Sequence, residues 1–306
     1  MAIKSSILYE NPSATAFVVD IPSSIAQAQA LPGQDFPPSR PHPAPSASGS
    51  YHGGRVLLSS TPLREPYPSS TEPKTEAARA RVLERIPLSE RRYHSELIEP
   101  LVTEKLTELN AALENNNEWC LPRIIVDSDA QGSPGDPTQG GYEQIQPGKR
   151  KRQRSIAASA IWITNSAKAR KTAYEAIRGA GLEVCEEWVW LKTTMDGRPI
   201  TEVGGLWRKP YEVLVIGRQV RESSEDGDVV RRVIAAVPDV HSRKPNLKEL
   251  FERMFFSSLE GGCVPYNALE VFARNLTAGW WACGDDVLKF NSEEWWVDDT
   301  EEGKDM

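Results

Sequence analysis

The sequence predicts an α/β fold in which one sheet carries helices on both faces. Between residues 155 and 290, apolar β-branched segments alternate with amphipathic helical segments, a pattern typical of a sheet covered by helices. Turn signals such as Asp196-Gly197 separate these segments, because an Asp-Gly pair suits positive φ. The chain of 306 residues, 39% of them apolar, is long enough for one substantial domain with appendages.

The N-terminal third has a different character. Twelve of the 23 prolines lie in the first 75 residues, together with many Ser and Ala, so we expect a disordered arm over residues 1–74. Residues 75–120 predict a helical extension, with leucines at helical spacing and interruptions at Pro87 and Pro100. Residues 121–290 are the predicted main domain. Residues 291–306, with seven acids and one lysine, are an expected acidic tail.

The elements of the main domain can be assigned in order. A buried strand at 123–127 ends on Asp127 and precedes a loop over 128–154 that is expected to be disordered. Further strands are predicted at 156–164, 183–193, 211–218, 229–237 and 268–274. One helix follows Asn165-Ser166 and ends near Gly181, and another follows Asn246, with Glu249 as its capping-box partner.

Charge and composition leave several function classes open. The net charge is −7, but the last 16 residues contribute −6 of it, so the body is nearly neutral and a nucleic-acid partner is not excluded. Five cations lie within 149–154, a run that fits a nuclear import signal, a phosphate contact or a solvated segment. No apolar run has the length of a membrane helix, and no signal-peptide pattern begins the chain, so a soluble intracellular protein is expected. With the basic run as an import signal, the nucleus is its expected location.

Other site chemistries lack their signatures. The four cysteines stand singly, and His241 is the only histidine beyond the first hundred residues, so we expect no metal site. The sequence contains no Gly-x-Gly-x-x-Gly, Walker, nucleophile-elbow or kinase motif, which disfavours dinucleotide oxidoreductases, nucleotide hydrolases and esterases.

Ligands of open α/β sheets bind outside the carboxyl ends of the strands. The residues at those ends are Asp127, Asn165, Lys192, His241 to Lys244, and Arg274-Asn275. We therefore expect the chemistry of the protein there. The tryptophan pairs 188/190, 280/281 and 295/296 could stack on bases, but packing is the better interpretation, since alternation places Trp188 and Trp190 on one face of a strand.

Several segments taken together resemble a known family. They are Ile161-Trp-Ile-Thr-Asn165, Glu187-Trp-Val-Trp-Leu-Lys-Thr193, Trp207-Arg-Lys-Pro-Tyr-Glu-Val-Leu-Val-Ile-Gly-Arg218, His241-Ser-Arg-Lys-Pro245, Leu269-Glu-Val-Phe-Ala-Arg-Asn275 and Gly284-Asp-Asp-Val-Leu-Lys-Phe290. Their order and content resemble the MT-A-seventy family of S-adenosylmethionine-dependent N6-adenine methyltransferases, closest to its methyltransferase-like-four branch.

The resemblance implies a Rossmann-like methyltransferase sheet, S-adenosylmethionine as cofactor, and adenine in RNA or DNA as the target. It implies that Lys244 neutralises the cofactor carboxylate and that Arg274 and Asn275 contact the cofactor near its ribose. It also implies that a hairpin flanked by Arg198, Trp207, Arg208 and Lys209 lies near the nucleic acid or near a protein partner. A second methyltransferase-like subunit is one such partner.

The sequence departs from the family pattern in two places. The family's Asp-Pro-Pro-Trp, whose carboxylate accepts a hydrogen bond from the adenine amine, does not occur. Asp127 is the nearest positional analogue and Asp136 is the nearest in spelling. Asp285 stands where the family has a cofactor-binding Asn, so it would bind a hydroxyl instead.

These departures keep an alternative function open. It is a catalytically degenerate member that binds nucleic acid or a protein partner, and an unstable truncated remnant is a third alternative.

Overall fold

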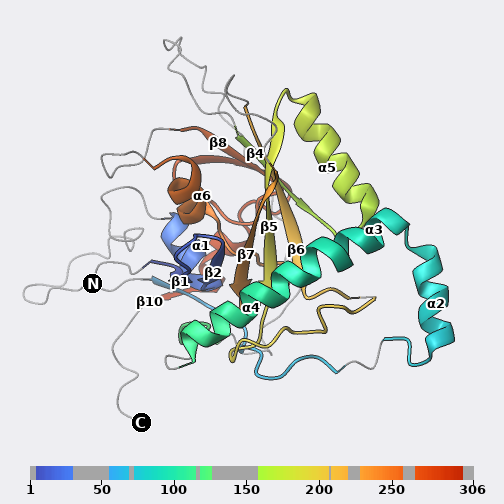
Figure 1. The fold of residues 1–306 in the computed structure, drawn as a ribbon. Coiled ribbons are helices and arrows are strands. Elements are labelled where there is room, and N and C mark those ends of the chain that lie inside the picture. The colour runs from blue at the N-terminus through green and yellow to red at the C-terminus, as the bar shows by residue number, and fades with distance from the viewer. Residues whose placement is uncertain are drawn as a thin grey trace, which may run out of the picture.

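The computed structural model describes residues 5–29, 55–68, 72–114, 118–125, 158–206, 208–219, 228–257 and 266–298. Six strands form the central sheet: β1 (Ile7–Glu10), β2 (Ala16–Val19), β7 (Val230–Ala236), β5 (Glu183–Lys192), β6 (Tyr211–Arg218) and β4 (Ala158–Ile163), in that spatial order (Figure 1). The sheet is mixed. β2, β7 and β5 run parallel, while β1 is antiparallel to β2 and β6 is antiparallel to both β5 and β4.

Helices cover both faces of this sheet, as the sequence predicts. On one face lie α4 (Glu99–Leu113) and α5 (Ala167–Gly179), which pack on Val189, Val213 and Val233 among others. Figure 1 shows α4 running diagonally across the strands. On the other face, α6 (Lys248–Phe255) stacks Phe251 and Phe255 on Trp188, and α1 (Ile21–Gln29) packs near Trp190. The fold is therefore an α/β sandwich consistent with a Rossmann-like methyltransferase.

Local sequence explains how α5 is placed. Ser166 caps the helix, since its hydroxyl accepts a hydrogen bond from the Ala169 N–H at 3.2 Å. Gly181, at φ +73°, ends the connection to β5. Gly217 of β6 lets the helix approach, because a Cβ there would overlap the Ile177 side chain.

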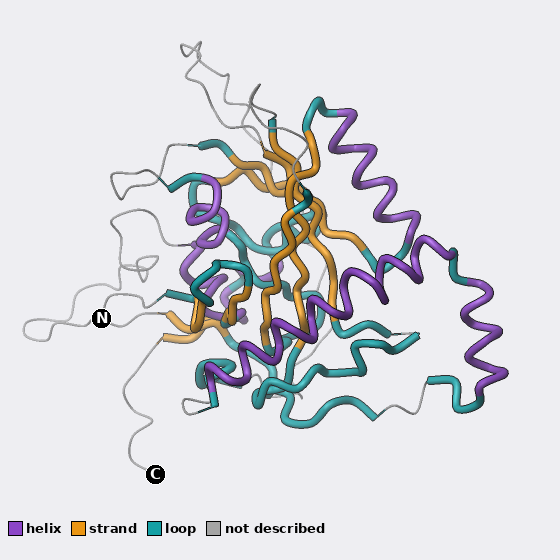
Figure 2. Tube along the Cα trace, viewed as in Figure 1, coloured by secondary structure: helices purple, strands orange, loops and turns teal. Residues whose placement is uncertain are grey.

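The remaining elements lie outside the central sheet. A helical region contains α2 (Glu76–Arg85), α3 (Leu88–Arg92) and the π-helical turn η1 (Tyr93–Ile98), which lead into α4. Two small ribbons pair β8 (Ala268–Val271) with β9 (Trp280–Cys283) and β3 (Arg55–Leu57) with β10 (Trp296–Asp298). Two 3₁₀ turns, η3 (Lys289–Asn291) and η4 (Glu293–Trp295), precede β10. Figure 2 shows α2 at the border of the molecule and the run from α3 through α4 crossing in front of the strands.

The expectation of a disordered arm over residues 1–74 is wrong for its described parts. β2 is fully buried, and α1 buries Ile21 and Ile25. The short strands escape detection because four residues carry too little periodicity to stand out from a Pro-rich and Ser-rich background. The folded unit therefore begins well before residue 121.

Three further expectations need correction. The predicted buried strand at 123–127 has, in its described part, one bridge between Ile125 and Ser59, with the Ile125 side chain 42% exposed. The acidic tail includes β10, whose Trp296 is buried. Glu249 does not close a capping box, because its carboxylate accepts hydrogen bonds from the backbone and hydroxyl of Ser6.

The predicted strand at 268–274 is also different. Its first four residues form β8, which pairs with β9 rather than with the central sheet and exposes Leu269 and Val271. No helix in the described ranges has both the length and the apolar character of a membrane span.

Candidate functional site

The carboxyl ends of four parallel strands meet along one edge of the sheet. Asp20 follows β2, Asp239 follows β7, Lys192 ends β5 and Asn165 follows β4. Glu212 lies at the same edge, because β6 starts there and runs in the opposite direction. Polar groups from five strands thus converge where open α/β sheets bind ligands.

Two lysines share one carboxylate at this edge. Lys192 Nζ lies 2.6 Å from Glu212 Oε1, and Lys244 Nζ pairs with Glu212 Oε2. Burial raises the pKa of Glu212, but hydrogen bonds from Lys192 and Lys244 outweigh burial and hold this pKa below its usual range. The cluster of Lys192, Glu212 and Lys244, which we call the lysine clamp, therefore carries one excess positive charge. That charge suits the carboxylate of a ligand.

Two tryptophans flank the lysine clamp. Lys244 Nζ lies 5.1 Å from the centre of the Trp162 ring and 5.3 Å from that of Trp190, and the two rings meet edge to face with centroids 6.0 Å apart. Trp190 Nε1 and Thr193 Oγ1 are buried without a hydrogen-bond partner within the described residues. Buried polar atoms without partners are rare in proteins, so both atoms are candidate contacts for a ligand.

The segment that carries the predicted cofactor residues Arg274 and Asn275 lies beside the loop that carries Lys244. Asn246, two residues after Lys244, donates a hydrogen bond to Thr277 Oγ1 at 2.8 Å. Asn275 is 9% exposed, and its amide makes only a long hydrogen bond of 3.4 Å to Leu276 O within the described structure. The Arg274 carbonyl accepts a hydrogen bond from the Phe290 N–H. These contacts bring the 274–277 segment beside the loop that carries Lys244.

Other predicted site residues lie elsewhere. Asp285 is exposed beyond β9 and makes no polar contact with any described residue. Arg198 is engaged by Glu65 at 2.9 Å and Asp196 at 2.7 Å, and Lys209 is engaged by Glu99 at 2.9 Å. Arg208 is exposed. Asp127, Asp136 and Trp207, together with the basic run at 149–154, lie outside the described residues.

One carboxylate at a strand end, that of Asp20, was not predicted from the sequence. Asp20 follows β2 directly, and Pro22 comes two residues later in Asp-Ile-Pro-Ser. Its carboxylate accepts hydrogen bonds from the Ser23 N–H at 3.0 Å, the Ser23 hydroxyl at 2.6 Å and the Leu121 N–H at 3.2 Å. The available signal was a short apolar run, Ala16 to Val19, that ends in Asp and Pro.

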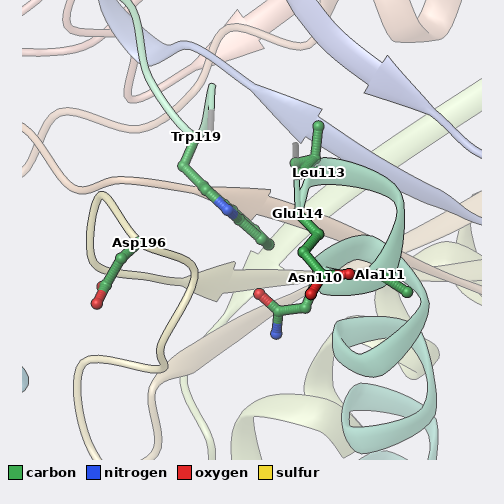
Figure 3. A pocket seen from close by; sticks show the side chains of 6 residues that line it. All are labelled: Asn110, Ala111, Leu113, Glu114, Trp119 and Asp196. Atoms are coloured by element: carbon green, nitrogen blue, oxygen red, sulfur yellow. The ribbon is translucent and has the colours of Figure 1, made fainter. Parts of the chain in front are cut away.

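A separate cavity of about 440 Å³ lies on the α4 face. Asn110, Ala111, Leu113, Glu114, Trp119 and Asp196 line it (Figure 3). Burial raises the pKa of Asp196, but Thr194 and Arg198 bond its carboxylate and hold the pKa below its usual range. Gly197, at φ +80°, packs on the Trp119 ring, with which a Cβ would collide. Of the two charged residues that line this cavity, Glu114 and Asp196, the carboxylate of Asp196 is thus already paired.

Comparison with known proteins identifies a family that the chain resembles. The MT-A70 family model matches residues 149–286. "N6-methyladenosine RNA methyltransferase MTA1" of Cryphonectria parasitica is 33% identical over 96% of this chain and 94% of its own length. A protein of the same name from Pyricularia oryzae is 42% identical over 45% of this chain and 36% of its own.

A mammalian relative extends the comparison. "N(6)-adenine-specific methyltransferase METTL4" of Mus musculus is 34% identical over 44% of this chain and 30% of its own length. The chain therefore matches one N6-adenosine methyltransferase over nearly its whole length and others over about a third of theirs. The chain belongs to the MT-A70 family.

Proposed function

We propose that this protein is an S-adenosylmethionine-dependent methyltransferase that modifies adenine N6 in RNA. The lysine clamp is the observation that carries the proposal, because its excess positive charge suits the carboxylate of an amino-acid cofactor. RNA is favoured over DNA because the relative that aligns with nearly the whole chain is named an RNA methyltransferase.

The residues present fit the cofactor. Lys244 and Lys192 would hold its carboxylate, in exchange for part of their contact with Glu212. The faces of Trp162 and Trp190 would lie near its positively charged end. Trp190 Nε1 and Thr193 Oγ1, which have no hydrogen-bond partner among the described residues, would bond its polar groups, and Arg274 and Asn275 would contact the ribose. When bound, S-adenosylmethionine supplies an activated methyl group.

The chain's contribution to transfer is alignment and hydrogen-bond acceptance. The adenine amine is a poor nucleophile, since its lone pair is delocalised into the ring, and an acceptor at its N–H stabilises the charge that develops. We assign this role to Asp20, which is held rigidly at the end of β2 by its own helix cap. No acid or base of altered pKa is needed, because the reaction depends on proximity and direction.

The test is methyl transfer to an adenine-containing RNA oligonucleotide, with N6-methyladenosine measured by mass spectrometry. The wild type should methylate it, and the same sequence as DNA should be a poorer substrate. Asp20→Asn, which keeps a good helix cap, should lower the rate about 100-fold or more while cofactor affinity stays within about twofold. Full activity in Asp20→Asn would remove Asp20 from the mechanism.

A second candidate function is nucleic-acid binding without catalysis. Asp20 is followed by Ile-Pro-Ser and not by the Pro-Pro-Trp of the family motif, so no aromatic ring that could help hold the base comes directly after it. In addition, both oxygens of Asp20 already accept hydrogen bonds. Salt-dependent RNA binding without any cofactor binding would favour this function.

A further inference from the structure

The loop between β7 and α6 turns two consecutive cations in different directions. Its turn is closed by a hydrogen bond from the Arg243 N–H to the Val240 carbonyl at 3.0 Å, with Ser242 in the left-handed region at φ +72°. Arg243 is 3% exposed and lies in the interior, whereas Lys244 reaches Glu212. The direction of Lys244 therefore depends on how this turn is held.

Arg243 is held on several sides. Its Nη1 lies 2.6 Å from Asp239 Oδ2 and 2.8 Å from the Leu58 carbonyl oxygen. The guanidinium carbon lies 4.3 Å from the ring centre of Phe290 and 4.9 Å from that of Trp295. Arg243 thus ties the turn to β3 and to the segment before β10.

Asp239, the ion-pair partner of Arg243, is held by contacts on its other carboxylate oxygen. Asp239 Oδ1 accepts a hydrogen bond from the Ser60 N–H at 2.7 Å and lies 3.8 Å from Arg123 Nη1. Arg123 in turn donates to the carbonyl oxygens of Val237 and Pro238, at 2.8 Å each. One buried network of two guanidinium groups and one carboxylate therefore holds the start of the loop, residues 237–239, and Arg243 at the end of its turn.

Stability alone does not account for such a network, because burying its charges costs solvation free energy. A buried ion pair can often be replaced by apolar side chains with no loss of stability, and its best-attested benefit is to specify one geometry. Here the geometry specified is that of the residue directly before Lys244.

We propose that Arg243 is a positioning residue: by fixing the turn, it holds Lys244 in the lysine clamp and so sets the affinity for the cofactor carboxylate. This inference rests on the proposed function for the identity of the ligand. It adds that Arg243, which does not reach the ligand site, acts only through Lys244.

A double-mutant cycle tests the coupling. S-adenosylmethionine is titrated calorimetrically into the wild type, Arg243→Met, Lys244→Ala and the double variant, with Arg243→Lys as the conservative replacement. We expect Arg243→Met to weaken binding about tenfold when Lys244 is present and less than about twofold when it is absent. Equal effects in both backgrounds would overturn the proposal.

Arg232→Met is the matched control for loss of stability. Like Arg243, Arg232 is a largely buried arginine in an ion pair, here with Glu186 at 2.7 Å. It lies on β7, near the end of the strand that is opposite to the loop with Arg243. Its loss should destabilise the fold without changing cofactor affinity. An equal loss of affinity in Arg232→Met would show that general loosening, and not positioning, explains the effect.

Amide hydrogen exchange of residues 239–246 in the free protein separates this inference from the proposed function. Arg243→Met should speed exchange in this loop, while Arg232→Met should leave it unchanged. If the loop loosens but no variant changes cofactor binding, the ligand assignment fails and the anchoring role stands. If the loop does not loosen in Arg243→Met, the positioning role itself is refuted.

Discussion

A buried charged cluster and a half-buried one lie on opposite faces of the same sheet and differ in how fully they are satisfied. On the α4 face, Glu187 is fully buried, and its carboxylate accepts hydrogen bonds from Tyr93 at 3.1 Å, Tyr174 at 2.9 Å and Arg231 at 2.8 Å. Burial, reinforced by Glu187, raises the pKa of both tyrosines. On the α1 and α6 face, the lysine clamp has two cations for one carboxylate and adjoins two buried polar atoms that have no partner in the described part of the chain.

The difference separates a structural role from a binding role. A saturated buried network ties elements together, and here it ties η1 and α5 to the sheet. In an undersatisfied cluster, some charge and some hydrogen-bonding groups are not paired within the cluster. A ligand can bind these groups without first breaking contacts within the protein, as it would have to do in a saturated network. Changes in the first cluster should therefore alter the free energy of unfolding, and changes in the second should alter ligand affinity.

The largest expected effect is on the Glu187 side. Glu187→Ala leaves two tyrosine hydroxyls and Arg231 without their shared acceptor, so the free energy of unfolding should fall by about 3 kcal/mol. Chemical denaturation measures this loss. Cofactor affinity of the folded protein should stay within about twofold, and a variant that keeps its stability but loses affinity would reverse the two roles.

An intermediate effect is expected from Glu270 on β8, which makes no ion pair or hydrogen bond with the described residues. Burial raises its pKa to about 7, above the usual value of 4.5. The folded state therefore holds the proton more tightly than the unfolded state, so stability should fall as pH rises from 4.5 to 7. Glu270→Gln should remove this slope and raise stability at pH 8 by about 1–3 kcal/mol. Thermal unfolding across this pH range measures the stability of both proteins. Identical profiles of stability against pH for the wild type and Glu270→Gln would contradict the assignment.

The smallest effect is expected from Glu212→Gln in the lysine clamp. The substitution removes the carboxylate that competes with the ligand for both lysines, so S-adenosylmethionine should bind about threefold more tightly. S-Adenosylmethionine analogues without a carboxylate provide the control, since their affinity should not rise. Weaker binding of the cofactor would mean that Glu212 positions the lysines more than it competes with the ligand.

Local patterns in the sequence predict the second half of the fold well. The strand at 211–218 and the helix that follows Ser166 agree with β6 and α5, because alternation, capping and a terminal glycine are all local signals. β1 and β2 were missed because each has four residues and gains its stability from pairing with distant segments. Glu249 has capping-box spacing, yet it bonds Ser6, 243 residues away.

The site could be predicted only in part for the same reason. Lys244 follows from the His-Ser-Arg-Lys-Pro resemblance, and its place beyond a strand end agrees with the structure. Its partner Glu212 is 32 residues distant and is the second residue of an antiparallel strand, a position that no rule about strand ends would select. Arg243 carried no separate signal, since its function comes from Asp239, Phe290 and Trp295 around it.

The central claim is that the lysine clamp is a carboxylate site for S-adenosylmethionine. The most direct measurement is a calorimetric titration of this cofactor into the full chain and into Lys244→Ala, with Lys168→Ala, an exposed lysine on α5, as the control. We predict that Lys244→Ala weakens binding at least about tenfold, while Lys168→Ala binds as the wild type does. Equal affinity of Lys244→Ala and the wild type would contradict the account.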